Sequence, residues 1–211
     1  TSSLVGSEMC IRDRDSIRYL NKGGYILFEI GFDQGKDVSE LLKNEGYHVW
    51  VNPVYCPDYG IPQTRKRLVL LASRLGNIEL INPTHKPNEY KTVKETIGDL
   101  PELKAGETDK NDPLHRAKAL SPLNLERLHH TPYGGSWKDW PKDLQLRCHK
   151  TDNGRSFGSV YGRMVWEKPA PTMTTQCTGL GNGRFGHPIQ DRAISIREAA
   201  LIQTFPMTYK F

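Results

Sequence analysis

The sequence predicts an α/β fold in its first part and a loop-rich region after it. Before residue 80, short apolar runs of strand length alternate with one amphipathic helical segment. From residue 82 onward, prolines punctuate short polar segments, and only brief helical patterns interrupt them. The order strand, helix, strand, turn, strand in the first part is typical of the closing half of an α/β sheet.

The α/β part rests on three apolar runs and one periodic segment. Each run is short enough for a buried strand and too short for a typical helix. The runs cover residues 24–30, 47–55 and 67–72. Residues 37–44 predict an amphipathic helix between the first two strands, with Val38, Leu41 and Leu42 on its inward face.

Three helices are expected in the loop-rich part. Two of them cover residues 93–100 and 122–130. The third begins at Ser195, because a serine followed three residues later by Glu198 forms a capping box. Pro206 stops this helix. Its buried face is expected to comprise Ala199, Ala200 and Ile202.

Length, charge and cysteine content limit the number of domains, the possible partners and the cellular compartment. A chain of 211 residues suits one large domain or two small ones, and its net charge of +5 allows an anionic partner without requiring one. The four cysteines show no paired spacing, so neither a zinc site nor a disulfide framework is predicted, and a reducing cytoplasm is expected. No apolar run approaches the roughly 20 residues of a membrane span. We therefore expect a cytoplasmic monomer without a membrane or metal partner.

The most informative motif is a turn followed by alternating polar and basic residues. The turn at 58–62 leads into Gln63, Arg65 and Arg67, where the apolar run 67–72 begins. At strand spacing these three side chains would share one face. Two neighbouring guanidinium groups need an anionic or carbonyl-rich partner, and phosphates and base edges match the planar fork of arginine. The alternative is a solvated strand end with two surface arginines.

A second motif near the C-terminus gives this pattern a family context. Gln-x-Arg-x-Arg at 63–67, followed by Arg-Glu-Ala-Ala-x-x-Gln-x-Phe-Pro at 197–206, resembles the eighth and ninth motifs of the DNA cytosine-5 methyltransferases. Segments 163–175 and 183–188 also resemble that family, and the resemblance runs from about residue 47 to 211. It implies the C-terminal half of an S-adenosylmethionine-dependent methyltransferase sheet plus a loop-rich target-recognition domain.

The resemblance also implies a division of the chain. Residues 15–80 would be a partial catalytic-domain sheet, 81–190 the target-recognition region, and 191–211 a helix returning to the catalytic domain. Residues 1–14 resemble translated adapter sequence and are expected to be a non-native leader.

The resemblance assigns roles at the reacting base to four side chains. In this family an enzyme thiolate attacks a cytosine that has left the base stack. Arg67 would donate to the cytosine carbonyl, and Arg65 would brace the pocket or a nearby phosphate unless it makes a surface salt bridge. Gln63 would help fix the loop on the DNA-binding side. Glu29 could pair with the ring nitrogen, because the family carries Glu-Asn-Val after this strand, although this sequence departs at the two following positions.

Further residues are expected to bind DNA or to support the fold. Hydroxyl groups and arginine can reach phosphate oxygens, although the threonines also suit an ordinary strand and His187 suits a packed turn. The residues expected on the DNA side are Thr172, Thr174, Thr175, Arg184 and His187. Those expected to prop the recognition domain against the catalytic one are Arg197, Glu198 and Gln203. The alternative for Arg197 and Glu198 is direct contact with DNA.

Two hallmarks of such an enzyme are absent from this sequence. There is no Pro-Cys-Gln nucleophile motif and no glycine-rich cofactor loop, and Cys56 is expected to be a small buried residue. We expect a fragment of a restriction–modification cytosine-5 methyltransferase that does not methylate DNA alone. Its partner would be double-stranded DNA, and the cofactor of the complete enzyme would be S-adenosylmethionine. The alternatives are a stand-alone DNA-binding module and, because residues 15–46 also resemble them, a fragment of a release-factor glutamine methyltransferase.

Overall fold

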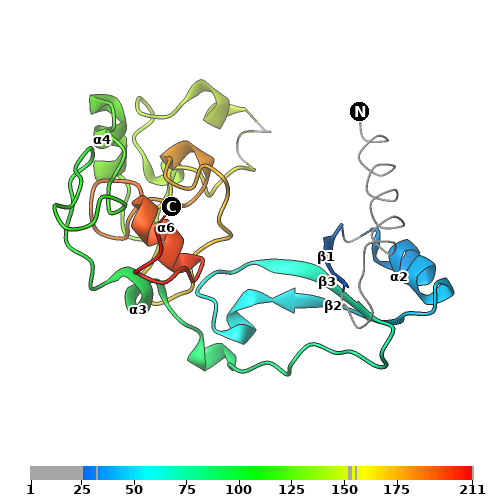
Figure 1. Cartoon of the computed structure of the whole chain (residues 1–211). Coiled ribbons are helices and arrows are strands. Elements are labelled where there is room, and N and C mark those ends of the chain that lie inside the picture. The colour runs from blue at the N-terminus through cyan, green and yellow to red at the C-terminus, as the bar shows by residue number, and fades with distance from the viewer. Residues whose placement is uncertain (1–25, 32, 152–153, 155, 211) are drawn as a thin grey trace. The chain divides into compact units, whose positions relative to one another are not determined.

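The computed structural model describes residues 26–31, 33–151, 154 and 156–210. Within these residues the chain divides into two compact units, whose elements can be followed by colour in Figure 1. The first unit comprises the described residues of Thr1–Tyr55 and Lys66–Pro83, and the second those of Cys56–Arg65 and Thr84–Phe211. The expected leader at 1–14 lies outside the described residues.

This division differs from the one predicted from the sequence. Residues 56–65 belong to the loop-rich unit, although they connect two strands of the sheet in the first unit. The C-terminal helix also belongs to the loop-rich unit. The assignment of the two parts to catalysis and to target recognition stays a prediction.

The first unit is a three-stranded sheet with one helix. β1 (Ile26–Ile30) and β2 (His48–Tyr55) both pair antiparallel with β3 (Lys66–Ser73), which lies between them. β1 and β2 are therefore parallel to each other, and α2 (Gly35–Asn44) makes the crossover that parallel strands require. The three predicted strands and the predicted helix are all present, with slightly shifted ends.

The core of this unit lies between α2 and the sheet. Val38 and Leu42 are buried, as predicted, whereas Leu41 is only partly buried and packs against the edge of the cluster. A β-carbon on Gly35 would lie 2.7 Å from Leu68 Cδ2, so the helix begins in close contact with β3 and a larger residue would displace this leucine. The buried cluster comprises Val38, Leu42, Tyr47, Leu70 and Ala72.

In the described residues of the second unit, short helices separate long irregular segments. α3 (Val93–Ile97) packs against α6 (Ile196–Ile202), and α4 (Pro122–His129) contributes Leu128 to a smaller cluster. α3 is three residues shorter than predicted, because Gly98, a poor helix former, caps it. The main cluster comprises Val93, Ile97, Met164, Ala170, Met173, Cys177, Phe185, Ile194, Ala199 and Ile202.

The predicted capping box at the start of α6 is confirmed. Ser195 Oγ accepts a hydrogen bond from Glu198 N at 3.1 Å, and Glu198 Oε2 accepts one from Ser195 N at 2.6 Å. Ala199, Ala200 and Ile202 are buried, as predicted. The helix ends at Ile202, before the proline that was expected to stop it.

A buried arginine joins several irregular segments of this unit. Arg163 is only 4% exposed, and its Nε donates to Thr131 O at 2.8 Å. Nη1 donates to His187 O at 3.0 Å and to Gln190 O at 2.6 Å, and Nη2 donates to Leu128 O at 2.9 Å. One guanidinium group thus satisfies carbonyls that a sheet would satisfy with ladder hydrogen bonds.

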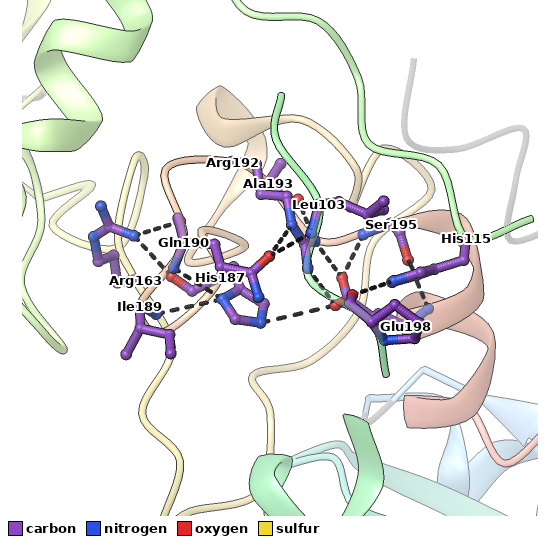
Figure 2. A network of polar contacts seen from close by, with 11 residues as sticks. Leu103, His115, Arg163, His187, Ile189, Gln190, Arg192, Ala193, Ser195 and Glu198 are labelled. Carbon is purple, nitrogen blue, oxygen red and sulfur yellow. Dashed lines mark hydrogen bonds and ion pairs between the residues drawn. The ribbon is translucent and has the colours of Figure 1, made fainter. Parts of the chain in front are cut away.

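A fully buried ion pair lies beside it. Arg192 Nη1 and Nη2 each donate to one carboxylate oxygen of Glu198 at 2.7 Å, in the bidentate geometry that Figure 2 shows. Both side chains are 1% exposed. Burial alone would raise the pKa of Glu198 and is the largest single effect, but the hydrogen bonds and charge of Arg192, together with the bond from Ser195 N, outweigh it and lower the pKa. The same carboxylate therefore neutralises Arg192 and caps α6.

His187 completes this network. Its Nε2 lies 3.8 Å from Glu198 Oε1, and its Nδ1 accepts from Ile189 N and Gln190 N at 3.3 and 3.0 Å. Burial lowers the pKa of His187 from 6.5 to about 3 in spite of the nearby carboxylate, so the ring is neutral at pH 7. It is a packed histidine in a turn, as the sequence suggested.

Replacing Glu198 by alanine is expected to lower the free energy of unfolding by about 3–5 kcal/mol, because Arg192 would stay buried without its partner. Urea unfolding at pH 7, followed by circular dichroism, measures this loss. Glu126→Ala, at an exposed position of α4, is the control and should change the free energy by less than about 0.5 kcal/mol. Equal effects of the two substitutions would contradict the assigned role.

The second unit, which contains His187, is also expected to lose stability as the pH falls below 6.5. Between pH 6.5 and about 3 the unfolded chain protonates His187 and the folded chain does not, so acid favours unfolding. At roughly 1.4 kcal/mol per pH unit, the loss between pH 6.5 and 5 is about 2 kcal/mol. His187→Gln should lower this slope by the share of one proton, at most roughly 1.4 kcal/mol per pH unit, whereas His129→Gln, at an exposed position, should keep it. Other groups of the unit, such as His149, whose pKa burial also lowers, keep the remainder of the slope. Urea unfolding at several pH values measures the slope of the free energy of unfolding against pH. An unchanged slope in His187→Gln would refute the neutral, buried state assigned to His187.

Candidate nucleic-acid interface

Residues Cys56–Arg65 form a loop that is closed on itself. Cys56 N donates to Arg65 O at 2.8 Å, and Gly60 N, in the predicted turn, donates to Pro57 O just before it at 3.0 Å. Gly60 has a φ of +76°, and a β-carbon there would lie 2.7 Å from the ring of His85. The turn therefore needs glycine both for its backbone conformation and for its packing.

Gln63 fastens this loop to residues 170–173. Its side chain is 4% exposed, and Oε1 accepts a hydrogen bond from Met173 N at 2.9 Å. Its backbone forms an isolated parallel bridge with Ala170, and Thr64 N donates to Ala170 O at 2.8 Å. Gln63 thus acts within the protein, and a contact between its side chain and DNA stays a prediction.

The prediction that Gln63, Arg65 and Arg67 share one strand face is wrong. β3 begins at Lys66, after both Gln63 and Arg65, because the backbone of this loop bonds to residue 170 and not to the sheet. Arg65 belongs to the second unit and Arg67 to the first. Both side chains are partly exposed.

Arg67 lies near the start of β3, opposite Val54 of β2, and its Nη1 donates to Lys66 O at 2.8 Å. Glu29 lies in β1, opposite Val69 of β3. The roles of Arg67, Arg65 and Glu29 at the target base stay predictions.

Thr172 lies within the segment that receives Gln63, and Thr174 and Thr175 directly follow it. Thr172 Oγ1 donates to Thr64 O at 3.0 Å, so this hydroxyl reinforces the docking of the loop. Thr174 and Thr175 are exposed. None of the three belongs to a strand, which removes the alternative that they are ordinary strand residues. Two exposed hydroxyl groups therefore directly follow the segment that receives the loop.

Arg184 is engaged with the backbone. Its Nη1 donates to Gly134 O, Gly135 O and Arg163 O at 2.5, 2.7 and 3.1 Å. Burial lowers the pKa of Arg184, although a guanidinium remains charged at neutral pH. A phosphate contact by this residue stays a prediction, and the described contacts give it a structural role.

The residues predicted to support the fold lie on α6 and at its end. Arg197 Nε and Nη2 donate to the two carboxylate oxygens of Asp112 at 2.5 and 3.1 Å, and this bonding lowers the pKa of Asp112. Glu198 holds Arg192, as described above. Gln203 is exposed and its Nε2 donates to Ala199 O at 3.4 Å. These contacts lie within the second unit, so a brace between two domains stays a prediction.

The described residues provide no evident metal site. They contain no group of three His, Cys, Asp or Glu side chains that could hold an ion. Cys56 is partly exposed and not buried as predicted, Cys148 is exposed, and Cys177 is buried. In the part of the chain that the structure describes, no helix is long and apolar enough to cross a membrane.

Sequence reasoning missed the partners that hold the loop and the network. Asp58 accepts from Tyr90 OH at 2.5 Å, and nothing in the sequence indicated that these residues meet. Arg163 lies in a segment that carried the family resemblance, and Arg192 lies just before the capping box, yet neither was singled out. A buried glutamate at a helix start is a signal that could have prompted a search for a cation.

Comparisons with known proteins agree with this picture. The C-5 cytosine-specific DNA methylase family matches over residues 33–211, which include residues 33–46 of the segment that also resembles release-factor methyltransferases. The Type II methylase M.HgiDII of Herpetosiphon aurantiacus is 56% identical over 172 residues, which are 82% of this chain and 49% of that protein. The Type II methyltransferase M1.BsuMI of Bacillus subtilis is 31% identical over 178 residues, 83% of this chain and 40% of that protein. The chain thus spans about half the length, or less, of these relatives.

The fold also matches a solved structure. A prophage-encoded protein from E. coli, described as a DNA modification methyltransferase, aligns with a TM-score of 0.60 and 18% identity. The alignment covers 89% of this chain and 60% of that protein, and it supports an α/β methyltransferase fold. With the sequence match over most of its length, the chain belongs to the C-5 cytosine-specific DNA methylase family.

Proposed function

We propose that the chain is the C-terminal portion of a DNA (cytosine-5-)-methyltransferase of a restriction–modification system. The complete enzyme transfers a methyl group to a flipped cytosine in double-stranded DNA and works as a cytoplasmic monomer. The observation that carries this proposal is the docked loop of a family member: Gln63 anchors it, and Arg65 and Arg67 follow on the chain. The buried hydrogen bond from Met173 N to Gln63 fixes the start of the segment that carries both arginines.

The arginines and the exposed hydroxyls have complementary roles in this proposal. A flipped cytosine presents a carbonyl oxygen, and Arg67 donates to it and stabilises charge that builds on the ring. Arg65 braces the pocket or a phosphate. Thr174 and Thr175, whose side chains are exposed, bind phosphate oxygens. Glu29 pairs with the ring nitrogen of the base.

The remaining chemistry is assigned to the half of the relatives that this chain does not match. S-adenosylmethionine supplies the methyl group, and we assign none of this chain's residues to its binding. The sequence contains no Pro-Cys-Gln motif that would provide the attacking thiolate. A second candidate is a DNA-binding module without chemistry, and an adjoining reading frame that encodes the motif would exclude it.

A chimaeric enzyme tests the proposed function. Residues 33–211 replace the matching half of the Herpetosiphon methylase, and transfer of tritiated methyl groups to duplex DNA is measured. The chimaera should methylate DNA, whereas this chain alone should not. A correctly folded chimaera without activity would contradict the proposal.

In that chimaera, Arg67→Ala should lower kcat/KM by about 100-fold or more, because a donor to the developing negative charge is lost. The dissociation constant for duplex DNA should change far less, since bulk binding rests on phosphate contacts. Arg74→Ala is the matched control in the same unit: this arginine lies over the ring of Tyr47 and should not affect turnover. Native turnover of Arg67→Ala would refute the role.

The isolated chain should bind duplex DNA weakly, with an affinity that falls as salt rises. Arg65→Ala should reduce the slope of log K against log salt by about 1, as expected for one lost phosphate contact. Arg116→Ala, at an exposed position outside the loop, should leave the slope unchanged. Fluorescence anisotropy of a labelled duplex measures both slopes, and salt-independent binding would count against a DNA interface.

A further inference from the structure

The Cys56–Arg65 loop has a second attachment besides Gln63. Asp58 O accepts hydrogen bonds from Thr84 N at 2.8 Å and His85 N at 3.0 Å. Its carboxylate Oδ1 accepts one from Tyr90 OH at 2.5 Å. Asp58, near the start of the loop, therefore bonds to residues 84–90, whereas Gln63, near its end, bonds to residues 170–173.

Tyr90 is itself held firmly. Two residues after it, Thr92 caps α3, and Val93 of that helix is fully buried in the main core. Val93 N donates to Lys168 O at 2.9 Å, and Lys94 N donates to Trp166 O at 3.1 Å. The tyrosine hydroxyl thus extends from a rigid helix start toward the loop.

These contacts form a closed circuit. The loop bonds through Asp58 to residues 84–90, which lead into α3. α3 in turn bonds to residues 166–168. The chain continues from there to residues 170–173, which bond to Gln63 of the loop. Arg65 ends the loop, next to the Gln63 anchor. Without the Tyr90 hydroxyl, Asp58 would keep only its backbone bonds to residues 84 and 85. Arg65, whose carbonyl bonds to Cys56 N at the other end of the loop, would then be held less firmly.

We propose that Tyr90 is a positioning residue for the methyl transfer: through Asp58 it holds the loop that carries Arg65. The inference rests on the proposed function for its catalytic consequence, but not for the mechanical one. A phenol hydroxyl bonded to a carboxylate is a charge-assisted hydrogen bond, stronger than a neutral one. The tyrosine ring adds a long, stiff reach with few rotatable bonds. Neither side chain needs to touch DNA.

Hydrogen exchange in the isolated chain tests the mechanical part. Tyr90→Phe removes only the hydroxyl, and the amides of Cys56, Thr64 and Arg65 should exchange about tenfold faster, as the loss of a bond to a charged group implies. The control is Glu107→Ala, which removes another hydrogen bond to a carboxylate of the same unit, from Lys104 N to Glu107 Oε2 at 2.6 Å. It should leave these three amides unchanged. Native exchange of the loop in Tyr90→Phe, or equal acceleration throughout the unit, would overturn the proposal.

Kinetics of the chimaera test the catalytic part. Tyr90→Phe should lower kcat about tenfold at saturating DNA, with KM for DNA within twofold and a melting temperature no lower than that of Glu107→Ala. Asp58→Asn retains an acceptor for the hydroxyl and should keep most of the activity. Asp58→Ala combined with Tyr90→Phe should be no worse than either alone, because both break the same bond.

A native kcat, an effect confined to KM or melting temperature, or additive losses would overturn the positioning role. An inactive parent chimaera would refute the proposed function instead. Hydrogen exchange in the isolated chain would still decide whether Tyr90 holds the loop.

Discussion

The loop-rich unit must satisfy its buried carbonyl and amide groups without the ladders of a sheet, and buried arginines meet that constraint. Arg163 and Arg184 donate to carbonyls from several segments, and Arg192 neutralises the glutamate that caps α6. Each guanidinium offers donors in one fixed plane, so it sets the relative position of several segments at once. In this unit the geometry of the arginines fixes the relative positions of chain segments, as the strand register does in the first unit.

This support reaches the candidate interface along the chain. Arg163 pairs with Gly186 through an isolated bridge, and Met164 N donates to Gly186 O at 2.9 Å. The chain then passes from these buried contacts to Ala170 and Met173, which receive the Gln63 loop. The interior network and the surface loop are therefore successive parts of one supporting segment, and disturbance of the first should loosen the second.

Local patterns in the sequence predicted local structure well. The periodicity of residues 37–44, the three apolar runs and the Ser195–Glu198 spacing are signals within a few residues, and the corresponding helix, strands and cap are all present. The position of Gln63 was missed because Met173, its partner, lies 110 residues away. Tyr90 and Asp58 are 32 residues apart and share no pattern. Alternation near Arg65 and Arg67 predicted a common face, but the backbone bond to residue 170 ends the strand between them.

The membership of Cys56–Arg65 in the second unit has a consequence for how such proteins diversify. The loop-rich unit is encoded by two stretches of sequence, separated by β3 and the residues after it. A recombination event with one crossover near residue 83 would transfer the long stretch and leave the matching loop behind. Gln63 would then have to bond to a segment around residue 173 that comes from another protein. A new recognition region should therefore be inherited together with its loop. Otherwise, substitutions in the loop and in the segment that receives it should occur together.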